Sequence, residues 1–280
     1  MKFAICNETF LDQPFDQAFR FAREVGYTGI EIAPFTIHTN AYEITPSKRA
    51  EVRRQVDDAG LEVIGLHWLL AKTTAGFYLT SPDVAVRTKT ADYLSELARL
   101  CADLGGKVMV LGSPLQRNLL PGVTHEQGMD FAADVLRRTV PALEKHDVRI
   151  AVEPLGPVEG DFLNTAALGV QLCELVASPQ VRLHLDVKAM STESTPIPQL
   201  IRENAGLLEH FHANDPNRRG PGMGDTDFLP IFAALAEIDY RGWVSVEVFD
   251  YEPGPERLAR ESIEYMWDCI DALTGEDSET

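Results

Sequence analysis

Cysteine, basic residues and long apolar runs are all scarce in this sequence. The four cysteines show no paired spacing, which argues against a disulfide framework and against a zinc ribbon. No apolar stretch approaches the length of a membrane-spanning helix, and the first residues lack the apolar core of a signal peptide. These shortages predict a protein of the reducing cytoplasm that has no membrane partner.

Positive charge is also in short supply, because 25 basic residues stand against 43 acidic ones and give a net charge of −18. A surface of this sign repels phosphate backbones, so we expect no nucleic-acid partner. Hydrophobic residues make up 45% of the 280 positions, enough for a continuous core. No Pro/Ser-rich linker divides the chain. We therefore predict one domain over residues 1–273 and an acidic disordered tail, "TGEDSET", at 274–280.

Short apolar runs alternate with longer amphipathic ones along the whole chain. A helical pattern is clearest at 82–104, and Gly26, Gly60 and Gly105 are placed as helix ends. The predicted strands are 3–6, 29–34, 61–68, 107–112, 148–154, 181–186, 208–214 and 243–249. Eight strands that each precede a helix indicate an α/β fold of the (β/α)8 TIM barrel type. An open doubly wound sheet is the structural alternative.

The last strand, "WVSVEVF", contains a carboxylate in an alternating apolar pattern. Its valines occupy one face, so Glu247 points to the other, which in a barrel is the interior. The same alternation turns Glu153, Asp186 and His212 inward near the ends of the three preceding strands. Because barrel active sites lie at the carboxyl ends of the strands, these four side chains are expected to meet there.

Three carboxylates and one imidazole at one mouth would repel each other unless a cation lay among them. Oxygen ligands with one nitrogen and no thiolate favour a hard or borderline divalent ion such as Mn2+, Mg2+ or Co2+ over a structural zinc. We expect one such ion per chain, with Mn2+ as the first candidate. The structural alternative is a set of buried salt bridges with Arg149, Arg182 or Lys188.

Four segments, "VEP…LNTA", "HLDVKAM", "HFHANDPNRRGPG" and "GWVSVEVF", resemble the xylose isomerase-like barrels of the sugar phosphate isomerase/epimerase superfamily. The resemblance covers essentially the whole chain, and ketose 3-epimerases are the nearest well-understood relatives. It implies that Glu153, Asp186, His212 and Glu247 hold the metal, and that the two glutamates also exchange protons with the sugar.

The resemblance implies a divalent-metal-dependent isomerase or epimerase of a sugar or keto-sugar. Such an enzyme removes a proton next to a carbonyl, and the metal stabilises the enediolate as a Lewis acid. A small carbohydrate is then the substrate, and a homo-oligomer is compatible with the sequence. Glu159 and Arg218 align with substrate-binding residues of the epimerases.

Two positions depart from the epimerase pattern. Ala189 stands where those enzymes have a histidine, with Lys188 beside it, and His67 stands where they often have a small residue or a cysteine. His67 and Lys188 are therefore candidate proton carriers. A second proton carrier would suit a lyase or dehydratase acting on a keto-glycoside or an inosose, or a keto-glycoside epimerase. A nuclease and a non-catalytic binding barrel are further alternatives. A nuclease would need a basic face for DNA, which this sequence lacks. A non-catalytic barrel would leave the set of predicted metal ligands unexplained.

Other candidate contacts lie near the predicted mouth. "GSPLQRN", which leaves the fourth strand, offers Ser113, Gln116 and Arg117 for hydroxyl or carboxylate groups of the substrate. Glu31 points inward on the second strand, where either a substrate contact or a buried ion pair is expected. The candidates for an aromatic wall are Phe35, Trp68 and Phe249.

Overall fold

Residues 1–73 and 75–275, which the computed structural model describes, contain a closed barrel of eight parallel strands. Each strand pairs with the next along the chain, and β8 pairs with β1 through Ile5 and Val246. The strands are β1 Lys2–Cys6, β2 Gly29–Ile32, β3 Glu62–Leu66, β4 Val108–Leu111, β5 Arg149–Val152, β6 Val181–Asp186, β7 Leu208–Ala213 and β8 Trp243–Val246. This closure confirms the TIM barrel and excludes the open doubly wound sheet.

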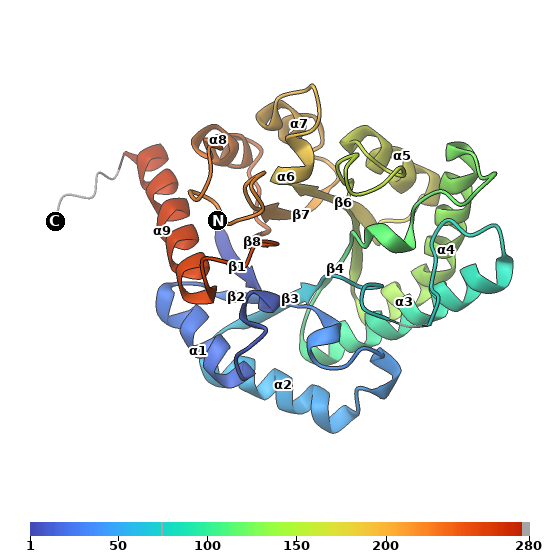
Figure 1. Ribbon diagram of the computed structural model, residues 1–280, viewed down its shortest axis with the longest axis horizontal. Coiled ribbons are helices and arrows are strands. Elements are labelled where there is room, and N and C mark those ends of the chain that lie inside the picture. Colours follow the sequence, from blue (N-terminus) through green and yellow to red (C-terminus); the bar gives the residue numbers. More distant parts are fainter. Residues whose placement is uncertain (74, 276–280) are drawn as a thin grey trace.

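Helices surround the barrel on the outside (Figure 1). They are α1 Phe15–Val25, α2 Pro46–Ala59, α3 Val84–Leu104, α4 His125–His146, α5 Ala166–Val176, α6 Val187–Met190, α7 Ile197–Glu203, α8 Leu229–Glu237 and α9 Pro255–Thr274. Short 3-10 turns follow some strands, at η1 Asn7–Phe10, η2 Pro34–Thr36, η3 Ala41–Glu43 and η4 Pro114–Gln116. None of the described helices combines the length and apolarity needed to cross a membrane.

Helix ends follow the local sequence. Gly26, Gly60 and Gly105 adopt the left-handed conformation at the ends of α1, α2 and α3, as predicted. Helix α3 begins at Val84 rather than at 82, because the Asp83 carboxylate accepts from the backbone N–H of Ala85 and caps it. Helix α9 continues to Thr274, one residue past the predicted domain boundary. Residues 276–280 of the predicted tail lie outside the described part of the chain.

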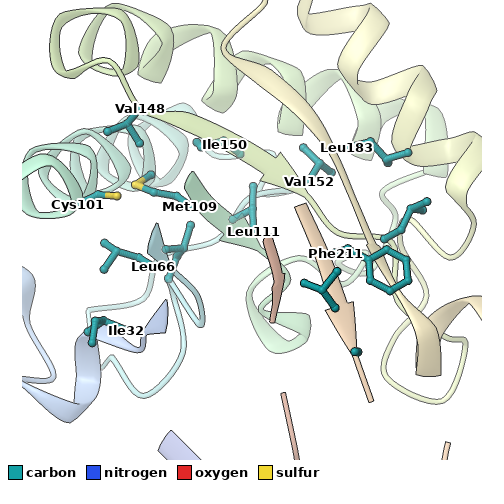
Figure 2. Packing of buried hydrophobic residues seen from close by; sticks show 14 of the residues in the cluster. Ile32, Leu66, Cys101, Met109, Leu111, Val148, Ile150, Val152, Leu183 and Phe211 are labelled. Atoms are coloured by element: carbon teal, nitrogen blue, oxygen red, sulfur yellow. The ribbon is translucent and has the colours of Figure 1, made fainter. Parts of the chain in front are cut away.

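The main core lies between the strands and the helices. Figure 2 shows Ile150, Val152 and Leu183 in this layer, with Leu111 and Phe211 from the neighbouring strands. Alternate residues of the same strands therefore point into the barrel, where polar side chains collect. The hydrophobic layer outside the barrel fixes the direction of the polar side chains inside it.

Six of the eight strands end earlier than predicted, and for two of them a site glutamate lies beyond the observed end. Strands β5 and β8 stop at Val152 and Val246, so Glu153 and Glu247 come directly after them. The backbone N–H of Glu153 still donates to the Leu111 carbonyl at 3.2 Å, and that of Glu247 donates to the Ala213 carbonyl at 3.4 Å. Both glutamates are thereby held to a neighbouring strand at the carboxyl end of the barrel.

Gly65 provides a test of barrel packing. A Cβ at Gly65 would collide with the backbone carbonyl of Val108 on the adjacent strand. We expect Gly65→Ala to lower the free energy of unfolding by about 2 kcal/mol, because overpacking forces the strands apart. Gly206→Ala is the matched control, since an added Cβ there meets no atom within 4 Å. Urea unfolding measures both, and equal stabilities would contradict the packing argument.

Candidate functional site

The four side chains expected to meet lie on adjacent strands at the carboxyl end of the barrel. Glu153, Asp186, His212 and Glu247 are all buried. Glu153, Asp186 and His212, together with His184, each place one ligand atom within 4.8 Å of the others. Glu247 joins this group through His212, whose Nδ1 lies 3.0 Å from Oε2 of the glutamate. The structure thus brings all four together.

The carboxylates in this group oppose one another electrostatically. Burial, followed by the charges of Glu247 and Asp186, raises the pKa of Glu153 to about 8. Burial likewise raises the pKa of Asp186, and Glu247 adds to that shift. Burial would also raise the pKa of Glu247, but the charge of His212 and its hydrogen bond outweigh it and hold that pKa below its usual value.

Fixed hydrogen bonds orient Glu247 and Asp186. The indole Nε1–H of Trp68 donates to Oε1 of Glu247 at 2.8 Å, so both oxygens of this carboxylate have a partner. Asp186 ends β6 and caps α6, where its Oδ1 accepts from the backbone N–H of Ala189 at 2.7 Å. Its Oδ2 accepts from the amide of Asn214 at 2.6 Å. Side chains on or after β3 and β7, together with the backbone of α6, therefore hold both carboxylates in defined positions.

The side chain of Glu153 passes over a glycine on the adjacent strand edge. Gly112 follows β4, and a Cβ at this position would occupy the same space as Oε2 of Glu153. A side chain at 112 would therefore displace Glu153 from the group. The sequence shows this glycine but not the close approach that requires it.

A buried histidine layer lies beside the four side chains and inside the barrel. Oε2 of Glu31 is 2.9 Å from Nε2 of His210 and 3.1 Å from Nε2 of His212. Burial alone would raise the pKa of Glu31, but the two histidines lower it well below its usual value. Of the two roles expected for Glu31, the structure shows the buried ion pair.

Glu8 is a buried carboxylate near the site that the sequence did not reveal. Its Oε2 lies 2.6 Å from Nε2 of His67, and both side chains are fully buried. Glu8 belongs to η1, a 3-10 turn, where strand alternation does not apply. Its place directly after β1 was the available signal, because every barrel strand ends at the same mouth.

The four side chains and the neighbouring His184 are suited to a divalent cation. Arg149 and Arg182, the cations considered as alternatives, both contact Glu209 instead. Lys188 forms its ion pair with Glu159. The two ring nitrogens of His184 are buried without a hydrogen-bond partner. Ring nitrogens without a hydrogen-bond partner, next to crowded carboxylates, are suitable ligand atoms for a metal. The alternative of salt bridges from Arg149 or Arg182 to the site carboxylates is wrong.

A pocket with a volume of about 500 Å3 opens above this group. Glu153 and Glu247 reach its wall, together with several residues predicted to contact substrate. These are His67, Ser113, Gln116, Glu159, Lys188 and Arg218. Trp68 and Phe249 form aromatic parts of the wall, with their rings stacked at a centroid distance of 6.4 Å. Phe35 lies against Trp68 at 5.6 Å and is not among the residues that line the pocket.

Arg117 differs from the expectation that it would lie at the mouth. It is buried and not among the residues that line the pocket, and its Nη1 donates to the backbone carbonyls of Glu153 and Leu111. Burial lowers the pKa of its guanidinium to about 10. Arg117 therefore supports the backbone at Glu153, a position that the pattern of "GSPLQRN" could not reveal.

Three residues that line the pocket have left-handed backbones. Trp68, Lys72 and Arg218 have φ values of 52°, 60° and 74°, which are uncommon for residues other than glycine. The carbonyl of Arg218 accepts from the backbone N–H groups of Phe249 and Asp250, which joins the loop after β7 to the segment after β8. Such strain persists only where surrounding contacts impose it, and it is common at binding sites.

The fold and the site define a (β/α)8 barrel enzyme with a carboxylate–histidine group at the mouth of its barrel. The model of the xylose isomerase-like TIM barrel family matches residues 19–269, and the chain belongs to this family.

Curated relatives agree with this assignment. A probable ketose 3-epimerase from Synechocystis sp. is 25% identical, over 90% of this chain and 89% of that protein. A 3-dehydro-D-guloside 4-epimerase from Escherichia coli is 24% identical, over 96% of this chain and 100% of that protein. The structure of D-psicose 3-epimerase from Clostridium cellulolyticum H10 matches with a TM-score of 0.83 at 20% identity, covering 96% of this chain and 99% of that one. The two curated relatives, both named epimerases, confirm the expected isomerase class, and the solved structure agrees with the fold.

Glu31 is the residue on which the buried histidine layer depends. We expect Glu31→Gln to lower the free energy of unfolding of the metal-free protein by about 3 kcal/mol, because it removes the charge that faces two buried histidines. Glu209→Gln is the control, since Glu209 pairs with the half-exposed Arg149. This substitution should lower the free energy of unfolding by less than about 1 kcal/mol. Urea unfolding distinguishes them, and a Glu31 variant as stable as the control would contradict this role.

Proposed function

We propose that the protein is a divalent-metal-dependent epimerase that acts on a sugar or keto-sugar, with Mn2+ as its preferred ion. The observation that carries the proposal is a division within the site. Glu153 and Glu247 line the pocket, whereas Asp186 and His212 are buried behind it and do not. Two carboxylates are thus available to a bound substrate.

Glu153, Asp186, His212 and Glu247 would hold the ion, with His184 close by. When bound, the metal supplies Lewis-acid stabilisation of negative charge on the substrate oxygens. Asp186 is fixed by Asn214 and by the α6 backbone, and His212 is fixed by Glu31, so both offer preset ligand atoms.

The two pocket glutamates are placed for proton transfer. Glu153 enters from β5 and Glu247 from β8, and Trp68 and His212 fix the orientation of Glu247. One carboxylate removes a proton from the carbon next to the carbonyl, and the other returns a proton to the opposite face, which inverts that carbon. The wall residues Glu159, Lys188 and Arg218 supply polar groups for the sugar hydroxyls.

A lyase or dehydratase is the second candidate, and one observation favours it. His67 and Lys188 also line the pocket, so the site contains proton carriers beyond the two glutamates. Their contacts restrain both residues, since His67 is held by Glu8 and Lys188 by Glu159. Either residue would have to protonate a leaving group in an elimination, which provides a direct test.

Metal binding is the first test. We expect one divalent ion per chain, and we expect Asp186→Ala or His212→Ala to abolish binding, because each removes a rigid ligand that no neighbour replaces. Calorimetric titration and elemental analysis measure the stoichiometry, with Asp250→Asn as a control in a partly exposed ion pair with Arg219. Chelation should also lower the melting temperature of the protein, because a metal that binds only the folded state stabilises it, and added metal should restore the melting temperature by mass action.

Protein that neither binds metal nor responds to a chelator would refute the metal site.

The second test concerns proton exchange. Glu247→Gln preserves the shape of the side chain but removes a base, so exchange should fall by at least about 10²–10⁴-fold. The assay follows solvent deuterium entering ketoses, keto-glycosides and inososes by NMR, with Glu252→Gln as an exposed control on the same loop. Full labelling by a metal-loaded Glu247→Gln protein would leave Glu247 as a ligand only.

The same assay separates epimerase from lyase. Turnover that is lost while deuterium exchange survives in His67→Asn or Lys188→Met would show that a second acid expels a leaving group. Exchange and turnover that fall together only at the two glutamates would establish the epimerase.

A further inference from the structure

The pocket is larger than the reacting sugar requires. A hexose has twelve non-hydrogen atoms, and even at the roughly 30 Å3 that a water molecule occupies in the liquid it would fill at most about 360 Å3. The pocket volume is about 500 Å3, which lies in the range of about 300–1,000 Å3 typical of sites for larger ligands. Part of the pocket therefore remains for a substituent on the sugar.

Leu115 and Val158 form an apolar rim that belongs to the lining of the same pocket. Leu115 and Val158 are 72% and 87% exposed, the highest values for large apolar side chains among the described residues, and both line this pocket. They come from neighbouring loops, Leu115 from η4 after β4 and Val158 from the turn that follows β5. Pro114 and the buried Leu155 are further apolar residues of the pocket lining. Two such side chains at one pocket mouth indicate a ligand that covers them.

Several polar groups of the pocket wall contact other groups of the protein. Next to Val158 in the turn, Glu159 pairs with Lys188, whose ammonium also lies 5.0 Å from the ring centre of Phe249. Nη2 of Arg218 donates to the carbonyl of Phe249 at 3.3 Å. Lys188 and Arg218 are thus engaged within the protein, and Lys72, the third cation of the lining, lies 5.9 Å from the ring centre of Trp68. The net charge of −18 opposes an anionic ligand. The substituent that fits beside Leu115 and Val158 is therefore neutral and apolar.

We propose that Leu115 and Val158, with Pro114 and Leu155, form a binding site for an apolar aglycone, so that the substrate is a neutral keto-glycoside with an aryl or branched alkyl group. This inference rests on the proposed function, because it assigns a substrate class to the same site. The aglycone covers the exposed rim while the sugar ring reaches Glu153 and Glu247. Burial of the two rim side chains contributes to binding without contact to the reacting carbon.

Binding of unreactive glycosides tests the site independently of turnover. The probes are phenyl glucoside and methyl glucoside, titrated calorimetrically into the metal-loaded protein. We expect the phenyl glycoside to bind at least about tenfold more tightly, because it adds apolar contacts at the rim. In the double variant Leu115→Ser/Val158→Ser the two glycosides should bind with equal affinity. Equal affinities in the unaltered protein would overturn the proposal.

A matched control uses exposed apolar residues elsewhere. Val84 and Leu273 are 52% and 38% exposed on α3 and α9, and Val84→Ser/Leu273→Ser should retain the preference for the phenyl glycoside. Sedimentation tests the competing occupant, a second copy of this chain. A dimer that dissociates in the Leu115/Val158 variant, with glycoside preference unchanged, would assign the rim to self-association and overturn the proposal.

The outcomes separate this inference from the proposed function. A preference for the phenyl glycoside that disappears in the rim variant supports the aglycone site even if no keto-sugar exchanges deuterium, in which case the epimerase proposal alone fails. Deuterium exchange in ketoses without any aryl preference supports the epimerase and refutes the aglycone site.

Discussion

The mutual repulsion of buried carboxylates at the mouth of the barrel is the constraint on which the site depends. Glu153, Asp186 and Glu247 lie close together in a buried environment where each opposes the ionisation of another. Only strong partners can keep such groups in place. His212 supplies one from within the protein, and the donor set is suited to a metal ion as another.

Support for these groups comes from several strands. Glu31 on β2 faces His210 and His212 on β7, and Trp68 after β3 donates to Glu247 after β8. The closed barrel makes such contacts possible, because residues far apart in the chain meet across its interior. These contacts tie the site to the barrel strands, whereas the apolar rim at Leu115 and Val158 lies on exposed connections between strands and helices. That difference suits chemistry at the fixed end and recognition of a variable substituent at the other.

How far the sequence predicts the site depends on the local structure of each residue. Glu153, Asp186, His212 and Glu247 were predicted because they follow or lie on alternating strands, whose period of two sets the direction of every second side chain. Glu8 and Arg117 belong to turns or loops, where side chains follow no regular period. The sequence therefore did not reveal the contact between Glu8 and His67, or the hydrogen bond from Arg117 to the carbonyl of Glu153. The predicted positions of the strand ends were also imprecise, because a strand ends where its backbone hydrogen bonds to the neighbouring strand end.

The sequence by itself determined the succession of eight strands and helices, the inward direction of the four site residues and the helix ends at Gly26, Gly60 and Gly105. Those features depend on local periodicity and on the backbone freedom of glycine. Only the tertiary structure decided that Arg149 and Arg182 pair with Glu209 rather than with the site carboxylates, and that Gly112 leaves space for Glu153. Partners of this kind are separated by many residues along the chain. Closure of the barrel brings them into contact, and a local sequence pattern does not predict contacts between residues so far apart in the chain.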